Sequence, residues 1–106
     1  MSLIVHRLKT WPGPFQAVWD GEKRHEIRKN DRDFKVGDLL DLQEWDPVEK
    51  RRPKEGRFIL AYVSYVTNGG EWGLPGDLCV MSLGSIHQGR QVDEDTQAPG
   101  VAEPKK

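Results

Sequence analysis

Residues 57–67 read RFILAYVSYVT and give the strongest strand signal in the chain. Apolar side chains occupy both faces of this extended segment, one face carrying Phe58, Leu60 and Tyr62 and the other Ile59, Ala61 and Val63. A strand that is apolar on both faces suits the centre of a barrel, where a helix covers one side. The sequence Asn68–Gly69–Gly70 that follows is a turn signal, so we expect the strand to end there.

Weaker strand patterns lie on both sides of this segment, at residues 3–9, 25–29, 39–45 and 78–86. In the segment 39–45, Leu40 and Leu42 point to one face, while Asp41, Gln43 and Trp45 point to the other. Residues 12–20 predict a short helix, because prolines are tolerated in a first turn and the apolar residues lie on one side. That apolar stripe consists of Phe15, Val18 and Trp19.

The predicted fold is therefore mainly β (α+β), with about five strands and one or two short helices. The spacing of the strands favours an all-β barrel. On the pattern alone, a small α+β sheet is an equal alternative. Residues 1–86 form the predicted domain. Residues 87–106 have no aromatic side chain and only two valines, so we expect a disordered C-terminal tail.

Composition narrows the class of protein. A chain of 106 residues is long enough for one domain. The net charge of −1 excludes a generally basic nucleic-acid binder, so any contact with nucleic acid must be a local patch. The single cysteine, Cys79, excludes an internal disulfide and fits a reducing cytoplasm. The chain has no apolar run long enough for a membrane span, and we expect a cytoplasmic monomer without a cofactor.

Residues 21–38, GEKRHEIRKNDRDFKVGD, form a highly charged segment between two turn signals. In its central strand, residues 25–29, Glu26 and Arg28 point to one face and Ile27 to the other. Because unpaired buried charges cost several kcal/mol each, we expect an apolar back and an exposed ionic front. A solvated edge strand with surface ion pairs explains the spacing equally well.

Lys23, Glu26 and Arg28 are the first candidates for binding chemistry. An arginine can hold a phosphate or carboxylate in a bidentate manner, and a glutamate can accept a hydrogen bond from an exocyclic amine of a base. A lysine can also act as a catalytic base when its surroundings favour the neutral form. The alternative is that Glu26 and Arg28 form an ion pair that only closes the mouth of a barrel.

Further candidates flank this set. Lys9 and Arg32 could add positive charge, and Trp11 and Trp45 could stack on a base, a contact worth about 1–3 kcal/mol. Packing of Trp11 against the predicted helix, or of Trp45 into the barrel end, is the structural alternative. The basic residues between positions 50 and 57 could follow a phosphate backbone, although a solvated charged loop is more common. The three histidines lie far apart in the sequence without ligand spacing, so no metal site is expected.

The same residues resemble a known family. Gly21, Lys23, Glu26 and Arg28 fit the G-x-K-x-x-E-x-R signature of the ASCH superfamily, whose fold is a PUA-like β-barrel. The longer text, LKTWP at 8–12, EIRKNDRDFKVGD at 26–38 and LQEWDP at 42–47, is similar to its DUF3850 branch of small bacterial and phage proteins. The resemblance extends over residues 3–86. It implies a PUA-like barrel whose signature residues lie at a cleft that binds RNA or a nucleotide.

The resemblance also leaves two alternatives open. Some ASCH proteins are amidohydrolases that deacetylate acetylcytidine, with a lysine three residues before a threonine nucleophile. Lys23 matches that lysine, but Glu26 fills the place of the threonine, and a carboxylate cannot replace a hydroxyl without a change of mechanism. A nucleoside amidohydrolase or ribonuclease that uses Lys23 and Glu26 is the enzymatic alternative. A phage protein that binds a host protein is the second.

Overall fold

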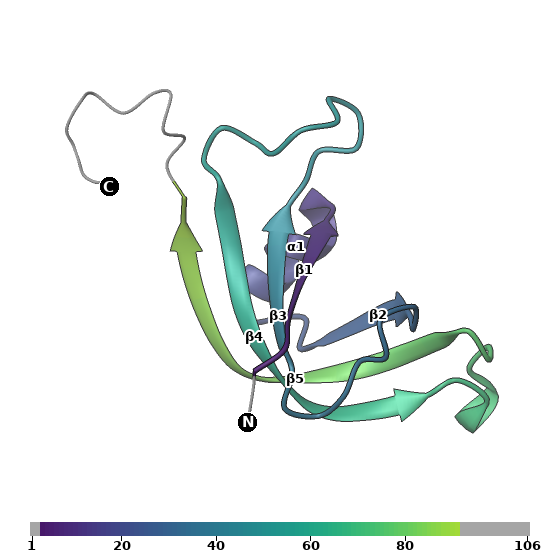
Figure 1. Cartoon of the computed structure of the whole chain (residues 1–106). Helices are drawn as coiled ribbons and strands as arrows, with labels where there is room; N and C mark the ends of the chain where they lie inside the picture. The colour runs from purple at the N-terminus through teal and green to yellow at the C-terminus, as the bar shows by residue number, and fades with distance from the viewer. Residues whose placement is uncertain (1–2, 92–106) are drawn as a thin grey trace.

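The protein is described by a computed structural model, in which residues 3–91 are placed. Over these residues the chain forms five strands, one α-helix and one short 3-10 helix (Figure 1). In chain order they are β1 (Val5–Thr10), α1 (Pro12–Trp19), β2 (His25–Lys29), β3 (Leu39–Glu44), β4 (Arg57–Asn68), η1 (Glu71–Gly73) and β5 (Leu78–Arg90). The prediction of a mainly β (α+β) fold is confirmed.

All five strands belong to one sheet with the order β1-β3-β4-β5-β2. β1 runs parallel to β3, and the other neighbours are antiparallel. The pairing of β4 with β5 shifts register between Ala61 and Tyr65, next to Gly84. Such irregularities bend strands, and both long strands curve strongly there, so that the sheet curls into a half-barrel (Figure 1).

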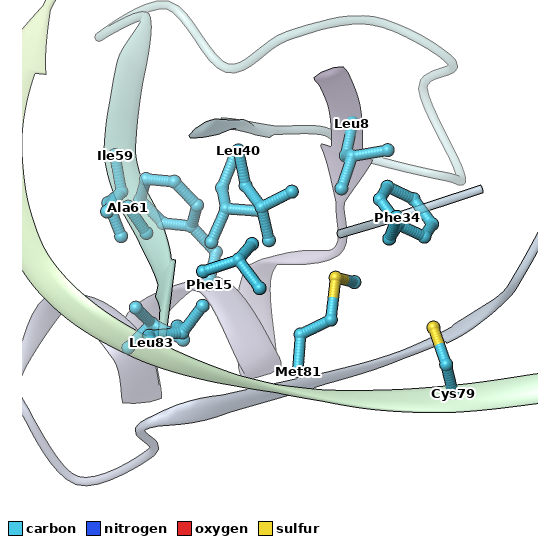
Figure 2. Packing of buried hydrophobic residues seen from close by; sticks show 12 residues of the cluster. Leu8, Phe15, Phe34, Leu40, Ile59, Ala61, Cys79, Met81 and Leu83 are labelled. Carbon is cyan, nitrogen blue, oxygen red and sulfur yellow. The ribbon is translucent and has the colours of Figure 1, made fainter. Parts of the chain in front are cut away.

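The core lies on the inner face of this curved sheet and is closed by α1. Figure 2 shows Phe15 of α1 among side chains from β1, β3, β4 and β5. Leu40 and Leu42 are both fully buried, as the alternation in β3 predicts. Phe34, from the charged segment, also packs into the core. The inward residues of β3, β4 and β5 are mainly apolar, which is the pattern expected for a sheet with one buried face, whereas β1 buries His6 and Thr10 beside Leu8.

β2 corrects the predicted orientation of the charged segment. Glu26 is only 3% exposed, whereas Ile27 is 52% exposed, so the ionic side of the strand faces inward and the apolar side faces solvent. The prediction failed because it treated the charges as unpaired. Two cations contact the Glu26 carboxylate, and pairing lowers the cost of burying it.

The end of the domain also differs from the prediction. β5 continues past Ile86 to Arg90, where it pairs with Arg57 of β4. His87 to Arg90 are therefore strand residues and not the start of a tail. The remainder of the predicted tail, residues 92–106, lies outside the described residues. In the part of the chain that is described, no helix has the length and apolar character needed to cross a membrane.

Cys79 provides a test of the core. Its side chain is fully buried, and this burial raises the pKa of the thiol above the ordinary value of 9.0, with a smaller contribution from the Asp31 carboxylate. Because the thiolate is the reactive form, we expect the native protein not to react with Ellman's reagent at about pH 8. The same protein unfolded in urea should react completely.

The raised pKa of Cys79 also makes the stability of the folded protein depend on pH. The folded state holds the Cys79 proton more tightly than the unfolded state, so this stability is fully present below the unfolded pKa and is lost as the pH rises through the folded one. Urea unfolding of the wild type and of Cys79→Ala should show a smaller alkaline loss in the variant. Equal labelling rates in the native and unfolded protein would contradict a closed core.

Candidate functional site

A pocket of about 400 Å³ opens where the end of β1 and the start of α1 meet β2. Its lining comes from two segments that are distant in sequence, residues 9–14 and 23–28. The lining residues are Lys9, Thr10, Trp11, Pro14, Lys23, Glu26, Ile27 and Arg28. The volume falls within the roughly 300–1,000 Å³ typical of small-molecule sites.

Glu26 is the centre of the polar part of this pocket. One carboxylate oxygen accepts a hydrogen bond from Nζ of Lys23 at 3.0 Å, and the other accepts one from Nε of Arg28 at 3.0 Å. The ammonium of Lys23 also donates to the carbonyl of His25. The two cationic side chains are themselves partly exposed. A buried carboxylate thus holds two cations at the surface of the pocket.

Arg28 also connects the two outermost strands of the sheet, β1 and β2. Its Nη2 donates to the carbonyl of Lys9 and to the hydroxyl of Thr10, each at 3.1 Å. β1 and β2 are the outermost strands in the sheet order, so these side-chain contacts join them where no backbone ladder does. The predicted alternative, in which Glu26 and Arg28 close the barrel mouth, is therefore part of what the structure shows.

The tryptophans take different positions. Trp11 lines the pocket and is 60% exposed, so it does not pack into the core under α1. Its backbone carbonyl accepts a hydrogen bond from the amide of Phe15 at the start of the helix. Trp45 lies outside the lining, and its ring contacts Nζ of Lys9, which is 4.0 Å from the ring centroid. A cation over a tryptophan face is favourable, and this contact orients Lys9.

Five of the seven predicted binding residues thus line the pocket: Lys9, Trp11, Lys23, Glu26 and Arg28. Arg32 does not line it, and instead donates from Nη1 to the carbonyl of Arg7 at 3.1 Å. Sequence reasoning missed Thr10, Pro14 and Ile27. The alternation of β1 could have indicated Thr10, because it shares the inward face with His6 and Leu8.

The pocket carries an excess of positive charge. Lys9, Lys23 and Arg28 contribute three cationic groups and Glu26 one carboxylate, which leaves two positive charges in excess. Among the ion pairs of the described residues, Lys9 has no carboxylate partner. Trp11 and Ile27 provide exposed apolar surface beside these charges. The site is therefore suited to a ligand with an anionic group and a flat apolar part.

Two of the basic residues between positions 50 and 57 make contacts within the protein. Arg57 makes two hydrogen bonds to the Glu44 carboxylate, and that contact raises the pKa of Arg57 above its ordinary value. Arg52 donates to the side chain of Gln91 and to the carbonyl of Gly56. Within residues 3–91, no group of His, Cys, Asp and Glu side chains is arranged to hold a metal ion.

The fold and the pocket define a small half-barrel protein with a cationic site between its two outermost strands. The chain belongs to the family described as Domain of unknown function (DUF3850), which matches residues 5–83. It is also similar to the "Uncharacterized 12.9 kDa protein in GpA 3'region" of Escherichia phage P2, with 35% identity over 72 residues. That alignment covers 68% of this chain and 62% of the phage protein, so it spans less than two thirds of the relative.

Proposed function

We propose that the pocket binds a nucleotide, either free or as one unit of an RNA strand. The observation that supports this best is the convergence of Lys9, Lys23 and Arg28 on one hollow beside the exposed Trp11. A nucleotide combines an anionic phosphate with a flat base, and the pocket offers cations and an exposed aromatic ring next to each other. We also propose that this half-barrel is of the ASCH, PUA-like type, because the signature residues Lys23, Glu26 and Arg28 lie together at the pocket.

The phosphate would contact cations that keep free donors. Arg28 uses Nε and Nη2 for protein contacts and leaves Nη1 free within the described part of the chain. Within residues 3–91, the Lys9 ammonium contacts the face of Trp45 and donates no hydrogen bond to another protein group, so it retains its donors. Two such groups on one side of a pocket are a common way to bind a phosphate.

The base would stack on Trp11, opposite the cationic side. Trp11 and Ile27 are exposed apolar side chains of the lining, and stacking of a base on an aromatic ring is worth about 1–3 kcal/mol. Each Glu26 oxygen keeps a second lone pair after its contact with a cation. It can therefore accept a hydrogen bond from an exocyclic amine, as in cytosine, adenine or guanine.

Lys23 acts as a donor in this arrangement and not as a base. Its ammonium donates to Glu26 and to the carbonyl of His25, and both contacts need protons on the nitrogen. A binding role therefore accounts for both contacts of Lys23 without a catalytic step. Nucleotides and RNA are abundant in the cytoplasm, and the cytoplasmic location of this protein stays a prediction.

Titration calorimetry with the four nucleoside monophosphates tests the proposal. Lys9→Ala should weaken binding about fivefold, because it removes one charge contact to the phosphate of about 1 kcal/mol. Trp11→Ala should weaken it by a similar factor, at the lower end of the range for stacking on one face. Lys54→Ala is the matched control, since Lys54 does not line the pocket, and it should bind like the wild type.

Two results would replace nucleotide binding by another function. If no monophosphate and no short RNA binds, the pocket is not a nucleotide site, and a protein partner captured after nuclease treatment would favour the interaction module. If acetylcytidine or RNA is converted to product, and Lys23→Ala abolishes that conversion while remaining folded, the protein is the enzyme of the alternative hypothesis.

A further inference from the structure

We propose that the pocket is one end of a cationic track along the open edge of β1, and that its ligand is a single-stranded polynucleotide and not a free mononucleotide. This inference rests on the proposed function and specifies its substrate class. One nucleotide would occupy the pocket, and the phosphate of its neighbour would contact Arg32 outside it.

The track begins with the exposed edge of the sheet. Among the strands of the described residues, β1 has β3 on one side and no neighbour on the other. The carbonyls of Ile4 and Thr10 accept hydrogen bonds from backbone amides at the two ends of β3. In a parallel pair the residues of a strand point their backbone groups alternately toward and away from the partner. The carbonyls of Arg7 and Lys9 are therefore on the open side.

Two arginines contact the carbonyls on that open side. Arg28 donates to the carbonyl of Lys9, and Arg32 donates to the carbonyl of Arg7, each at 3.1 Å. Since strand residues rise by about 3.3 Å each, the two anchored guanidinium groups lie about 7 Å apart. This spacing is comparable to that between successive phosphates of an extended single strand.

Arg32 is free to contact a ligand. It is exposed, it uses Nη1 for the Arg7 carbonyl, and within residues 3–91 it has no carboxylate partner. The nearest acidic groups in sequence are Asp31 and Asp33, and Lys35 pairs with Asp33. Arg32 thus offers an unneutralised guanidinium, held by the edge of the sheet, outside the pocket.

Arg7 does not add an unpaired charge to this edge, because its Nε is 3.4 Å from the carboxylate of Asp41 on the neighbouring strand β3. The order along the edge is the pocket with Arg28 and then Arg32. A mononucleotide in the pocket cannot use Arg32, because Arg32 does not line it, whereas a longer strand can. Lengthening the ligand should therefore add affinity that depends on Arg32.

Calorimetric titration with a cytidine series tests this, from the monophosphate through the di- and trinucleotide to the octanucleotide. Cytidine is chosen because its amine can donate to Glu26. We expect affinity to rise from the mononucleotide to the trinucleotide and then level off. Arg32→Ala should weaken trinucleotide binding about fivefold, reduce the salt slope by about 0.7, and leave the monophosphate unaffected.

Lys35→Ala is the matched control, because it removes the same charge from the same loop at a side chain that already pairs with Asp33. It should change trinucleotide affinity less than twofold by the same electrostatic reasoning. The same titration with the deoxycytidine series distinguishes the two sources of a single strand, RNA and DNA. Equal affinity indicates that only the backbone is recognised, tighter RNA binding indicates contact with the 2′-hydroxyl, and both results support the track.

The track is wrong if the monophosphate and the longer strands bind equally, or if Arg32→Ala and Lys35→Ala have the same effect. It is also wrong if a duplex binds more tightly than the single strand. In those cases the pocket still binds a nucleotide and the proposed function stands. If neither the monophosphate nor any strand binds, the proposed function fails, and the track fails with it.

Discussion

Replacing Glu44 by alanine is expected to lower the free energy of unfolding by about 3 kcal/mol, because it leaves the Arg57 guanidinium unpaired in the interior. The side chains of Glu44 and Arg57 are only 7% and 12% exposed. Two hydrogen bonds, of 3.0 and 2.9 Å, join the guanidinium to the carboxylate. Removing one partner of such a pair costs more than the pair itself contributes.

The guanidinium of Arg57 is packed against aromatic rings, so the cost of leaving its charge unpaired persists when Glu44 is removed. Its guanidinium carbon lies 5.1 Å from the ring centroid of Phe15 and 4.9 Å from that of Trp19. The hydrogen bond from Arg57 to Glu44 is the main cause of the raised pKa of Arg57. A guanidinium does not lose its proton under ordinary conditions, so the charge persists in the variant. The loss of stability should therefore be the same throughout the neutral pH range.

Urea unfolding followed by tryptophan fluorescence measures the effect. The double variant Glu44→Leu with Arg57→Met should recover most of the loss, since an apolar pair of similar volume needs no partner. Lys35→Ala is the control for an exposed pair, with Asp33, and should change the stability by less than about 0.5 kcal/mol. A Glu44→Ala variant as stable as Lys35→Ala would show that the buried pair contributes little.

Arg28→Lys should weaken nucleotide binding at least tenfold and lower the free energy of unfolding by about 2 kcal/mol, although the charge is kept. Arg28 makes three hydrogen bonds at once, to Glu26, to the carbonyl of Lys9 and to Thr10. A lysine ammonium is a single point of charge and cannot reach all three partners. The contact between β1 and β2, and with it the shape of the pocket, depends on the planar guanidinium.

Titration with the monophosphate that binds the wild type best, together with urea unfolding, tests this prediction. Arg24→Lys is the matched control, because it makes the same change in the same segment at an exposed side chain outside the pocket lining. It should leave both affinity and stability within error of the wild type. If Arg28→Lys binds like the wild type, the pocket needs only positive charge, and the bridging geometry is not required.

Local patterns in the sequence predicted the elements well. Alternation placed β2 at residues 25–29 and identified the buried face of β3, and the apolar stripe of Phe15 and Val18 predicted α1. These features depend on neighbours within a few residues, which a sequence displays directly. The signature residues Lys23, Glu26 and Arg28 were also recognisable, because they lie within six positions of one another in the chain.

The arrangement of the site could not be predicted in the same way. The burial of Glu26 depends on two cations that satisfy it, and the pocket depends on the meeting of β1 with β2, which are separated by α1 in the chain. The exposure of Trp11 and the position of Arg32 over the Arg7 carbonyl also require that meeting.

The sequence by itself determined the strands, the helix and the identity of the charged signature, because backbone periodicity and residue type act over short distances. Only the tertiary structure decided which face of β2 is buried, which cations share the Glu26 carboxylate and where the hollow lies. The reason is that the cations paired with Glu26 must themselves be held, and Arg28 is held by the carbonyl of Lys9 and the hydroxyl of Thr10, which the curl of the sheet brings close. The pocket is lined by residues 9–14 and 23–28 together, and neither segment contains the site alone.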